Sequence, residues 1–397
     1  MGVAKIIFLV GGPLTKRWLF NYRIDELAQS FDVEYWDCSP LIAHPYHVTE
    51  ELQREYAYQI DSFETLDQRL AQQPWDAILI PEIGFCEENY PLLKRIAAKI
   101  RYCLMIDIWS YNLLDNVDSL TSKGNSISQH SFHSMRFAKS LLRKLREVFK
   151  PDKQPHYTEV NYTQACRDLF EIYEISYKPT AQYSINHVDY EKYLEAKAQS
   201  VRRQDKYIVY VGQYFPLHPE YAMIEPNVNF PSLVEPFYKS LNAFFDRLED
   251  VYKCPVIIAE HPSGNNKGNP YDGREVVFYQ TAELIRDSYA VCMHCTNAFS
   301  MVALFDKPVA ILTCDALRVS KNLGGRTEKF ASILRTPLVD MDKNQDLSNI
   351  FTPMGKELRE SFLSVFVDTE REQGNAELLQ KHIQTIHNEI ILKRNTK

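Results

Sequence analysis

The sequence predicts an α/β protein with two domains, each built around a sheet of parallel strands. Short apolar runs rich in Val, Ile, Leu and Tyr alternate with amphipathic segments of helical period. The length of 397 residues fits two domains that are each large enough for their own core. A second strand–helix series begins after the charged run at 197–206. We therefore expect a first domain over residues 1–200, a second over 201–375, and a final helix in 376–397 that returns to the first domain.

The composition limits the classes of partner. A hydrophobic content of 45% and a charged content of 24% are typical of a soluble globular protein. The net charge of −7 disfavours a nucleic-acid partner, because phosphate backbones bind basic surfaces. The amino-terminal apolar run has no signal-peptide pattern, and no uncharged apolar stretch is long enough to span a bilayer. We expect a cytoplasmic protein, in which the basic segment 132–153 is either an exposed amphipathic helix or a peripheral contact with the inner membrane face.

The eight cysteines predict buried, reduced thiols in a cytosolic protein. Five of them lie in or beside expected strands: Cys38, Cys86, Cys103, Cys292 and Cys314. Cys292 and Cys295 form a lone CxxC. Strand residues three apart point to opposite faces of a sheet, so we expect no metal site there.

The first domain is expected to alternate strands with helices. The strands are expected at 5–10, 33–38, 76–80 and 102–108, and the helices at 18–30, 63–72, 91–99 and 162–173. The Gly11-Gly12 turn lacks the spacing of a dinucleotide-binding fingerprint and is either a cleft-facing turn or a tight strand-to-helix connection. Carboxylates at strand ends, Glu82 and Asp107, are placed where ligands bind in open α/β sheets.

The second domain carries the most informative stretch, residues 256–313. Strand runs at 256–259, 290–293 and 308–312 end in polar or small residues. The first run delivers Glu260, His261 and Pro262, followed by a loop at 263–273 that is too polar to pack and long enough to move. The second run delivers residues 294–297 ahead of an apolar helix at 298–305. A Thr or Asn cap with free backbone N–H groups at that helix start predicts an anion site.

At these residues the chain resembles the nucleotide-binding half of GT-B glycosyltransferases. The resemblance is to bacterial surface-polysaccharide enzymes that use CMP-activated acidic sugars, namely Kdo transferases of capsule assembly and polysialyltransferases. Those families carry a His-Pro, then a Ser/Thr-rich turn and a helix that ends in a Lys-Pro strand. His261-Pro262, the segment 294–297 and Lys307-Pro308 match in that order over residues 205–315. The chain departs from the pattern at Thr296-Asn297, where relatives often have paired serines.

The resemblance implies two Rossmann-like domains that face a central cleft. It also implies transfer of a sugar from a nucleotide-sugar donor, without metal or other cofactor, to a glycan or lipid-linked glycan of capsule or lipopolysaccharide synthesis. In Kdo transferases a strand ends in a glutamine that faces the nucleotide, and Gln213 after the strand 207–211 resembles it. Residues 187–190 (His-Val-Asp-Tyr) resemble an element found upstream of the nucleotide domain in related proteins.

Site residues follow from these motifs, with structural alternatives beside them. The expected nucleotide and phosphate contacts are Gln213, His261, Pro262, Thr281, His294, Thr296 and Asn297. His294 could instead belong to the core, and Thr281 could simply cap the helix that it opens. The candidates for the general base are Glu82, Asp107 and Asp189, with Glu220 as a further option; each could equally be a solvated or capping carboxylate.

Two other residues have two interpretations each. His218-Pro219 either gates the cleft or forms a turn. Arg274 either meets a sugar carboxylate or phosphate, or is a surface arginine. The rival functions are a polyol-phosphate transferase, a nucleotide-sugar epimerase, and a non-catalytic sugar-nucleotide-binding scaffold.

Overall fold

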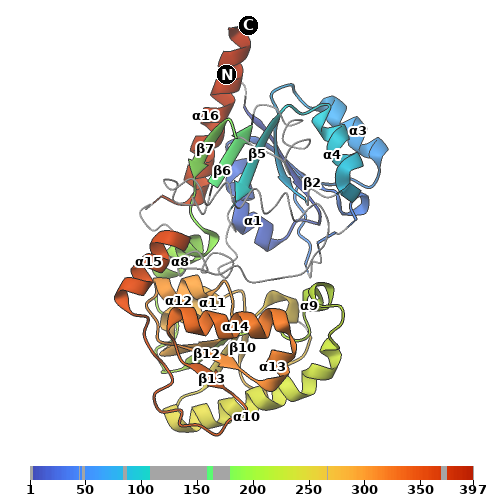
Figure 1. Ribbon diagram of the computed structural model, residues 1–397. Helices are drawn as coiled ribbons and strands as arrows, with labels where there is room; N and C mark the ends of the chain where they lie inside the picture. The colour runs from blue at the N-terminus through green and yellow to red at the C-terminus, as the bar shows by residue number, and fades with distance from the viewer. Residues whose placement is uncertain are drawn as a thin grey trace, which may run out of the picture. The chain divides into compact units, whose positions relative to one another are not determined.

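The computed structural model describes residues 3–43, 45–46, 50–83, 87–107, 159–163, 179–265, 267–367 and 373–396. Their contacts divide the chain into two compact units (Figure 1). Unit 1 contains the described residues up to 107, those of 159–186, and those from 373 onward. Unit 2 contains residues 187–367.

Unit 1 is built on a sheet of seven strands in the order β3-β2-β1-β4-β5-β6-β7. The strands are β1 (Lys5–Val10), β2 (Asp32–Asp37), β3 (Ala57–Gln59), β4 (Ile78–Glu82), β5 (Tyr102–Asp107), β6 (Glu159–Thr163) and β7 (Ala181–Ser184). The first five pair in parallel, whereas β6 and β7 add an antiparallel edge. On one face of this sheet, Ile7, Leu9 and Leu79 pack with the helices α3 (Phe63–Gln72) and α4 (Tyr90–Ala97).

The helix predicted at 162–173 is wrong at its start. Tyr162 and Thr163 lie in β6, which runs antiparallel to β5. The sequence Glu-Val-Asn-Tyr-Thr alternates polar and apolar residues with the period of a strand, and its β-branched and aromatic residues favour that state. The remainder of that prediction, and the basic segment at 132–153, lie outside the described residues.

The helix predicted at 18–30 is two helices, α1 (Lys16–Tyr22) and α2 (Ile24–Ala28). Arg23 separates them in the left-handed conformation, with a φ of 51°. The expectation that the cysteines are reduced is wrong for Cys103 of β5, which is disulfide-bonded.

The last helix, α16 (Asn375–Asn395), belongs to unit 1 and lies beside β7 (Figure 1). Its first residue and Asn186 are both buried and hydrogen-bond reciprocally: the Asn186 amide donates to Asn375 Oδ1 at 2.7 Å, and Asn375 Nδ2 donates to the Asn186 carbonyl at 2.9 Å. Further along, His387 Nε2 lies 3.1 Å from Asp76 Oδ2. These contacts fix the helix along most of its length. Among the described helices, none is both long and apolar enough to cross a membrane.

Unit 2 is built on six parallel strands in the order β10-β9-β8-β11-β12-β13. The strands are β8 (Ile208–Val211), β9 (Val256–Glu260), β10 (Val276–Phe278), β11 (Ala290–Met293), β12 (Val309–Thr313) and β13 (Leu338–Asp340). The strands alternate their side chains between two cores. Val209 and Val211 of β8 face one core, and Ile208 and Tyr210 face the other.

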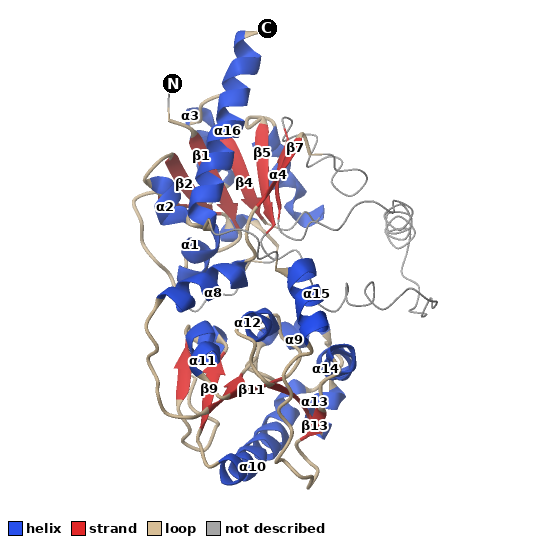
Figure 2. Ribbon diagram, turned by 90° about the vertical axis from the view of Figure 1, so that its left-hand side faces the viewer, coloured by secondary structure: helices blue, strands red, loops and turns tan. Residues whose placement is uncertain are grey.

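Helices cover both faces of this sheet (Figure 2). On the side of Val209 lie α8 (Val188–Ala198), α11 (Thr281–Asp287), α12 (Phe299–Leu304), α14 (Lys321–Leu334) and α15 (Lys356–Phe366). On the side of Tyr210 lie α10 (Val234–Tyr252) and α13 (Asp315–Val319). The short helix α9 (Pro219–Ile224) follows β8. The apolar runs of the strands are continuous because both faces are buried. The α/β class and the two Rossmann-like units are thus confirmed.

Adjacent glycines are typical of a loop, so the sequence predicts one at 324–325, but both glycines lie inside α14. Gly324 faces α13 closely: a Cβ atom there would lie 2.7 Å from the carbonyl oxygen of Leu317. At Gly325 a Cβ atom would meet nothing within 4 Å. The first glycine permits close packing of two helices, and the second has no such role.

This pair predicts opposite effects of the same substitution. Gly325→Ala should stabilise unit 2 by about 0.5–1 kcal/mol, because alanine is the better helix former. Gly324→Ala should destabilise it by about 1–3 kcal/mol, because the new methyl group meets a backbone oxygen that cannot move alone. Urea unfolding of both variants beside the wild type measures the difference. Equal effects of the two substitutions would contradict this packing of α14.

Candidate functional site

The candidate site is the carboxyl edge of the unit 2 sheet, between β8 and β11. Strand β8 pairs with β9, the next strand in the chain, on one side and with β11 on the other. The strand order therefore reverses between β8 and β11. In open α/β sheets, ligands bind outside the strands at such a point. Gln213, just after β8, spans the two strands: its Nε2 donates to the Cys295 carbonyl at 2.7 Å. Gln213 Oε1 is buried and has no hydrogen-bond partner among the described residues.

Two histidines from neighbouring strand ends meet at this edge. His218 follows β8 and His261 follows β9, and their rings are 5.0 Å apart between centroids, at an interplanar angle of 84°. Each ring caps the turn that follows it. Nδ1 of His218 accepts from the Glu220 amide at 3.3 Å, and Nδ1 of His261 accepts from the Ser263 amide at 3.2 Å. Because Nδ1 is the acceptor, a neutral ring carries its proton on Nε2.

This tautomer determines what the pair can do. Both imidazoles have Nε2–H as their donor, on rings whose centroids lie 5.0 Å apart at the strand ends. Such donors suit the oxygens of a phosphate or a ribose. Pro262 follows His261 directly and begins the short 3-10 turn Pro262–Gly264 that His261 caps.

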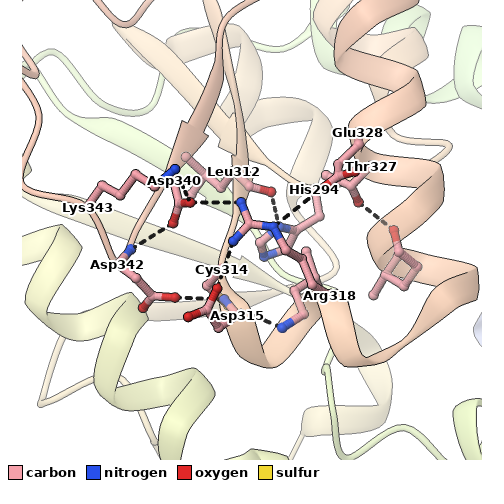
Figure 3. Close-up of polar contacts among 12 residues, drawn as sticks. His294, Leu312, Cys314, Asp315, Arg318, Thr327, Glu328, Asp340, Asp342 and Lys343 are labelled. Carbon is pink, nitrogen blue, oxygen red and sulfur yellow. Dashed lines mark hydrogen bonds and ion pairs between the residues drawn. The ribbon is translucent and has the colours of Figure 1, made fainter.

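His294 has a different environment, although it also follows a strand. It is completely buried, with the rings of Tyr210 and Phe237 5.8 Å away between centroids. Nδ1 lies 2.7 Å from the Leu312 carbonyl and therefore donates to it (Figure 3). Nε2 is buried without a hydrogen-bond partner among the described residues. Burial lowers the pKa of His294 to about 4. Its side chain thus belongs to the core, the second of the two interpretations open from the sequence.

The start of α12 differs from the anion site predicted there. The helix begins at Phe299. The amides of residues 298–301 already have acceptors: Thr296 Oγ1 for Ala298, and backbone carbonyls for the other three. The prediction of free N–H groups at this helix start is therefore wrong for these four. The amides of Thr296 and Asn297 donate to no acceptor within the described part of the chain, and Asn297 is exposed.

Thr281 is the first helical residue of α11 and does not cap it; the cap position is Gln280, without a side-chain hydrogen bond. It follows β10, the edge strand, which is separated from β11 by β9 and β8. The structure thus places Thr281 apart from the β8–β11 point, whereas it brings Gln213, His218, His261 and the loop at 295–297 to neighbouring strand ends.

The three carboxylates proposed as base lie in different surroundings. Glu82 ends β4 in unit 1, next to the β1–β4 reversal of that sheet, and Tyr46 donates to its carbonyl at 3.2 Å. Asp107 ends β5 of the same sheet. Asp189 is buried in unit 2, where it accepts from Ser300 Oγ at 2.9 Å and pairs with Lys192 at 3.5 Å. Asp189 therefore holds α8 to α12.

One arginine near the candidate site was missed by sequence reasoning. Arg326 of α14 makes no hydrogen bond or ion pair with a described residue, and its charge acts on the Cys295 thiol. Burial raises the pKa of that thiol to about 12, and Arg326 opposes the rise. The neighbouring Thr327 accepts from the Cys295 amide at 3.3 Å, which places this turn of α14 beside the end of β11. No sequence signal pointed to Arg326, because the two glycines that precede it favour a loop over a helix.

Arg274 lies at the opposite, amino edge of the sheet, and ion pairs hold its side chain there. Its guanidinium pairs with Asp246 at 2.6 Å and with Glu249 at 2.8 Å. It lines a hollow of about 330 Å³ together with residues of 202–207, 249, 255–257 and 275. The neighbouring Arg203 is paired with Glu275. We find no role for Arg274 at the strand ends where the histidines meet.

The fold and this edge define a class, α/β proteins with two Rossmann-like units and a polar strand-end site in the second. No protein-family model matches the chain, and no curated protein is similar to it. Among solved structures, it is similar to the wall teichoic acid polymerase TagF, with 10% identity, a TM-score of 0.47, and coverage of 98% of this chain and 89% of that one. A UDP-GlcNAc 2-epimerase from Methanocaldococcus jannaschii, in complex with UDP-GlcNAc and UDP, has 13% identity, a TM-score of 0.39, and coverage of 91% and 99%. A family 9 glycosyl transferase from Veillonella parvula has 10% identity, a TM-score of 0.29, and coverage of 98% and 99%. At these scores the assignment of the fold depends on the two strand orders themselves.

The environment of His294 predicts a pH dependence of stability. Its pKa is about 4 in the folded protein and near 6.5 when unfolded, so the unfolded chain binds the extra proton first. The stabilisation is complete above pH 6.5 and is lost as the pH falls toward 4, with a loss on the order of 2–3 kcal/mol by pH 4.5. His294→Asn keeps a donor for Leu312 and cannot titrate. Urea unfolding at pH 7 and pH 4.5 should show a smaller loss for this variant, and an identical loss in both proteins would contradict the burial of His294.

Proposed function

We propose that this chain is a nucleotide-sugar-dependent glycosyltransferase whose donor nucleotide binds at the carboxyl edge of the unit 2 sheet. The observation that carries the proposal is the pair His218 and His261, whose rings meet after two adjacent strands and share the Nε2–H tautomer. This pair lies next to the strand-order reversal at which α/β proteins bind nucleotides.

The leaving phosphate would be stabilised by groups of this edge. His261 and His218 supply the imidazole donors, and the amides of Thr296 and Asn297 supply backbone donors across the reversal. Arg326 supplies a charge that no described residue neutralises. Groups fixed before the reaction stabilise developing negative charge more effectively than mobile water, because they need no reorganisation.

The finer parts of the proposal concern donor and acceptor. The resemblance at His261-Pro262 and Lys307-Pro308 favours a CMP-linked Kdo-like or nonulosonic acid as the donor and a cell-surface glycan, free or lipid-linked, as the acceptor. A general base must deprotonate the acceptor hydroxyl if the reaction inverts the anomeric centre. Glu82 and Asp107 are the better candidates, because both end strands of unit 1, whereas Asp189 is engaged between two helices.

Nucleotide selectivity is the first test. Thermal unfolding of the wild type should shift upward with CMP and less with CDP, UDP or GDP, because a ligand that binds the folded state stabilises it by mass action. A selective shift with UDP or GDP would retain the site and discard the CMP donor. No shift with any nucleotide at millimolar concentration would contradict the proposed function.

Removal of one imidazole is the second test. His261→Ala should lower the transfer rate by about a hundredfold or more, the usual cost of deleting one preorganised donor. The control is His382→Ala in α16 of unit 1, which removes an imidazole that contacts the Ser184 carbonyl at 3.1 Å and should leave transfer near the wild-type rate. Circular dichroism checks that both variants are folded. Full activity of His261→Ala would contradict the site.

The reaction product separates glycosyl transfer from its rivals. A glycosidic product identified by mass spectrometry and NMR supports the proposal. A phosphodiester product would identify a polyol-phosphate transferase, and a free epimerised sugar would identify an epimerase. Binding without any product, across a broad acceptor panel, would identify a non-catalytic scaffold.

A further inference from the structure

The carboxylate of Glu260 connects the loops that carry the two histidines. Glu260 is the last residue of β9 and is only 4% exposed. Its Oε1 accepts from the Tyr214 amide at 3.0 Å and from the His261 amide at 2.6 Å. Its Oε2 accepts from the hydroxyl of Tyr271. Three connections, after β8, directly after β9 and before β10, therefore converge on one side chain.

The connection continues from Tyr214 to the second histidine. The Tyr214 carbonyl accepts from the Leu217 amide at 2.8 Å and from the His218 amide at 2.9 Å. Two hydrogen bonds, which meet at Tyr214, thus connect the backbone of His218 to the Glu260 carboxylate. A single hydrogen bond connects the backbone of His261 to it. Tyr214 itself has a φ of 53°, a left-handed conformation that is costly for a residue with a side chain and persists only where its surroundings fix it.

The fit around this carboxylate is close on two sides. A Cβ atom at position 212 would lie 2.5 Å from Glu260 Oε1, and one at position 264 would lie 3.1 Å from Glu260 Cγ. Both positions are glycines, one directly after β8 and one in the turn after His261. Because glycine alone leaves room there, the two backbones lie directly against the Glu260 side chain.

Tyr271 shows that the third connection is anchored and not simply a polar loop. The loop at 263–273 was predicted to be too polar to pack, and this is wrong for Tyr271, which is 2% exposed. Its ring lies 5.4 Å from that of Tyr238 and 6.4 Å from that of Tyr210 between centroids. The hydroxyl that reaches Glu260 is therefore held from within the core.

We propose that Glu260 is a positioning residue, which orients the imidazoles of His218 and His261 toward a common phosphate by fixing the backbone of both. The catalytic part of this inference rests on the proposed function, whereas the orientation of the rings does not. Glu260 itself does not reach a ligand, since its oxygens are occupied by the three donors.

The test uses three variants of Glu260 and one matched control. Glu260→Ala removes the acceptor, and Glu260→Asp withdraws it by one methylene group in case the alanine variant does not fold. Glu260→Gln keeps the shape, because its amide oxygen accepts from both backbone amides while its NH2 group donates to Tyr271. The control, Asp340→Ala, removes another buried carboxylate at a strand end of the same sheet. Asp340 is 6% exposed and accepts from Arg318 at 2.8 Å (Figure 3). It ends β13, which β11 and β12 separate from β8 in the sheet.

The first measurement is the nitrogen NMR spectrum of the imidazoles in the protein without nucleotide. We expect the Nε2–H tautomer for His218 and His261 in the wild type, in Glu260→Gln and in Asp340→Ala. In Glu260→Ala and Glu260→Asp, we expect mixed tautomers for both rings. Unchanged spectra in both of these variants would overturn the proposal, whatever the protein binds.

The second measurement is the nucleotide affinity of the same proteins by titration calorimetry. We expect binding about tenfold weaker in Glu260→Ala and Glu260→Asp, because displaced donors lose their alignment with the phosphate. Glu260→Gln should restore it, and Asp340→Ala should lower stability without changing affinity. An equal loss of affinity in Asp340→Ala would show a general structural effect and overturn the positioning role. Absence of binding by the wild type would remove the proposed function, and the NMR result would still decide the role of Glu260.

Discussion

The parallel pairing of β8 with β9 on one side and β11 on the other is the constraint on which unit 2 depends. Three neighbouring strands end at the same edge, and their connections must diverge, so the backbone groups at that edge lose their sheet partners. Side chains replace those partners. Gln213 donates to the Cys295 carbonyl, and Glu260 accepts from the amides of Tyr214 and His261. The site is therefore a consequence of how the sheet satisfies its own carboxyl edge.

Histidine occurs at this edge in two physical states, and the local backbone decides which. Where a turn follows at once, as at His218 and His261, Nδ1 accepts from the amide two residues on and the Nε2–H becomes the donor. His187 caps α8 in the same way, although it is buried and burial lowers its pKa. At His294 the ring turns inward, Nδ1 becomes the donor to Leu312, and the group belongs to the core. The hydrogen bond that Nδ1 makes thus decides whether the histidine caps the turn that follows it or packs into the core across the sheet.

The sequence predicted β8, β9, β11 and β12 of unit 2 and the residues that follow them, because continuous apolar runs between turns are a strong local signal. It did not predict the three-residue strand β13. It left His294 undecided, since a residue after a strand can turn to either side. It also missed features that depend on distant partners. The glycines of α14 indicate a loop unless one knows that α13 packs against Gly324, and Tyr271 stands in a polar segment whose core contacts are made with Tyr210 and Tyr238. The convergence of Tyr214, His261 and Tyr271 on Glu260 is likewise a tertiary fact, spread over residues 214–271.

The most direct test of this account is a crystal structure of the protein with a bound nucleotide. The account predicts a phosphate within hydrogen-bonding distance of Nε2 of both His218 and His261, at the carboxyl edge of the unit 2 sheet. A nucleotide bound instead at the amino edge, in the hollow lined by Arg202 and Arg203, would contradict it.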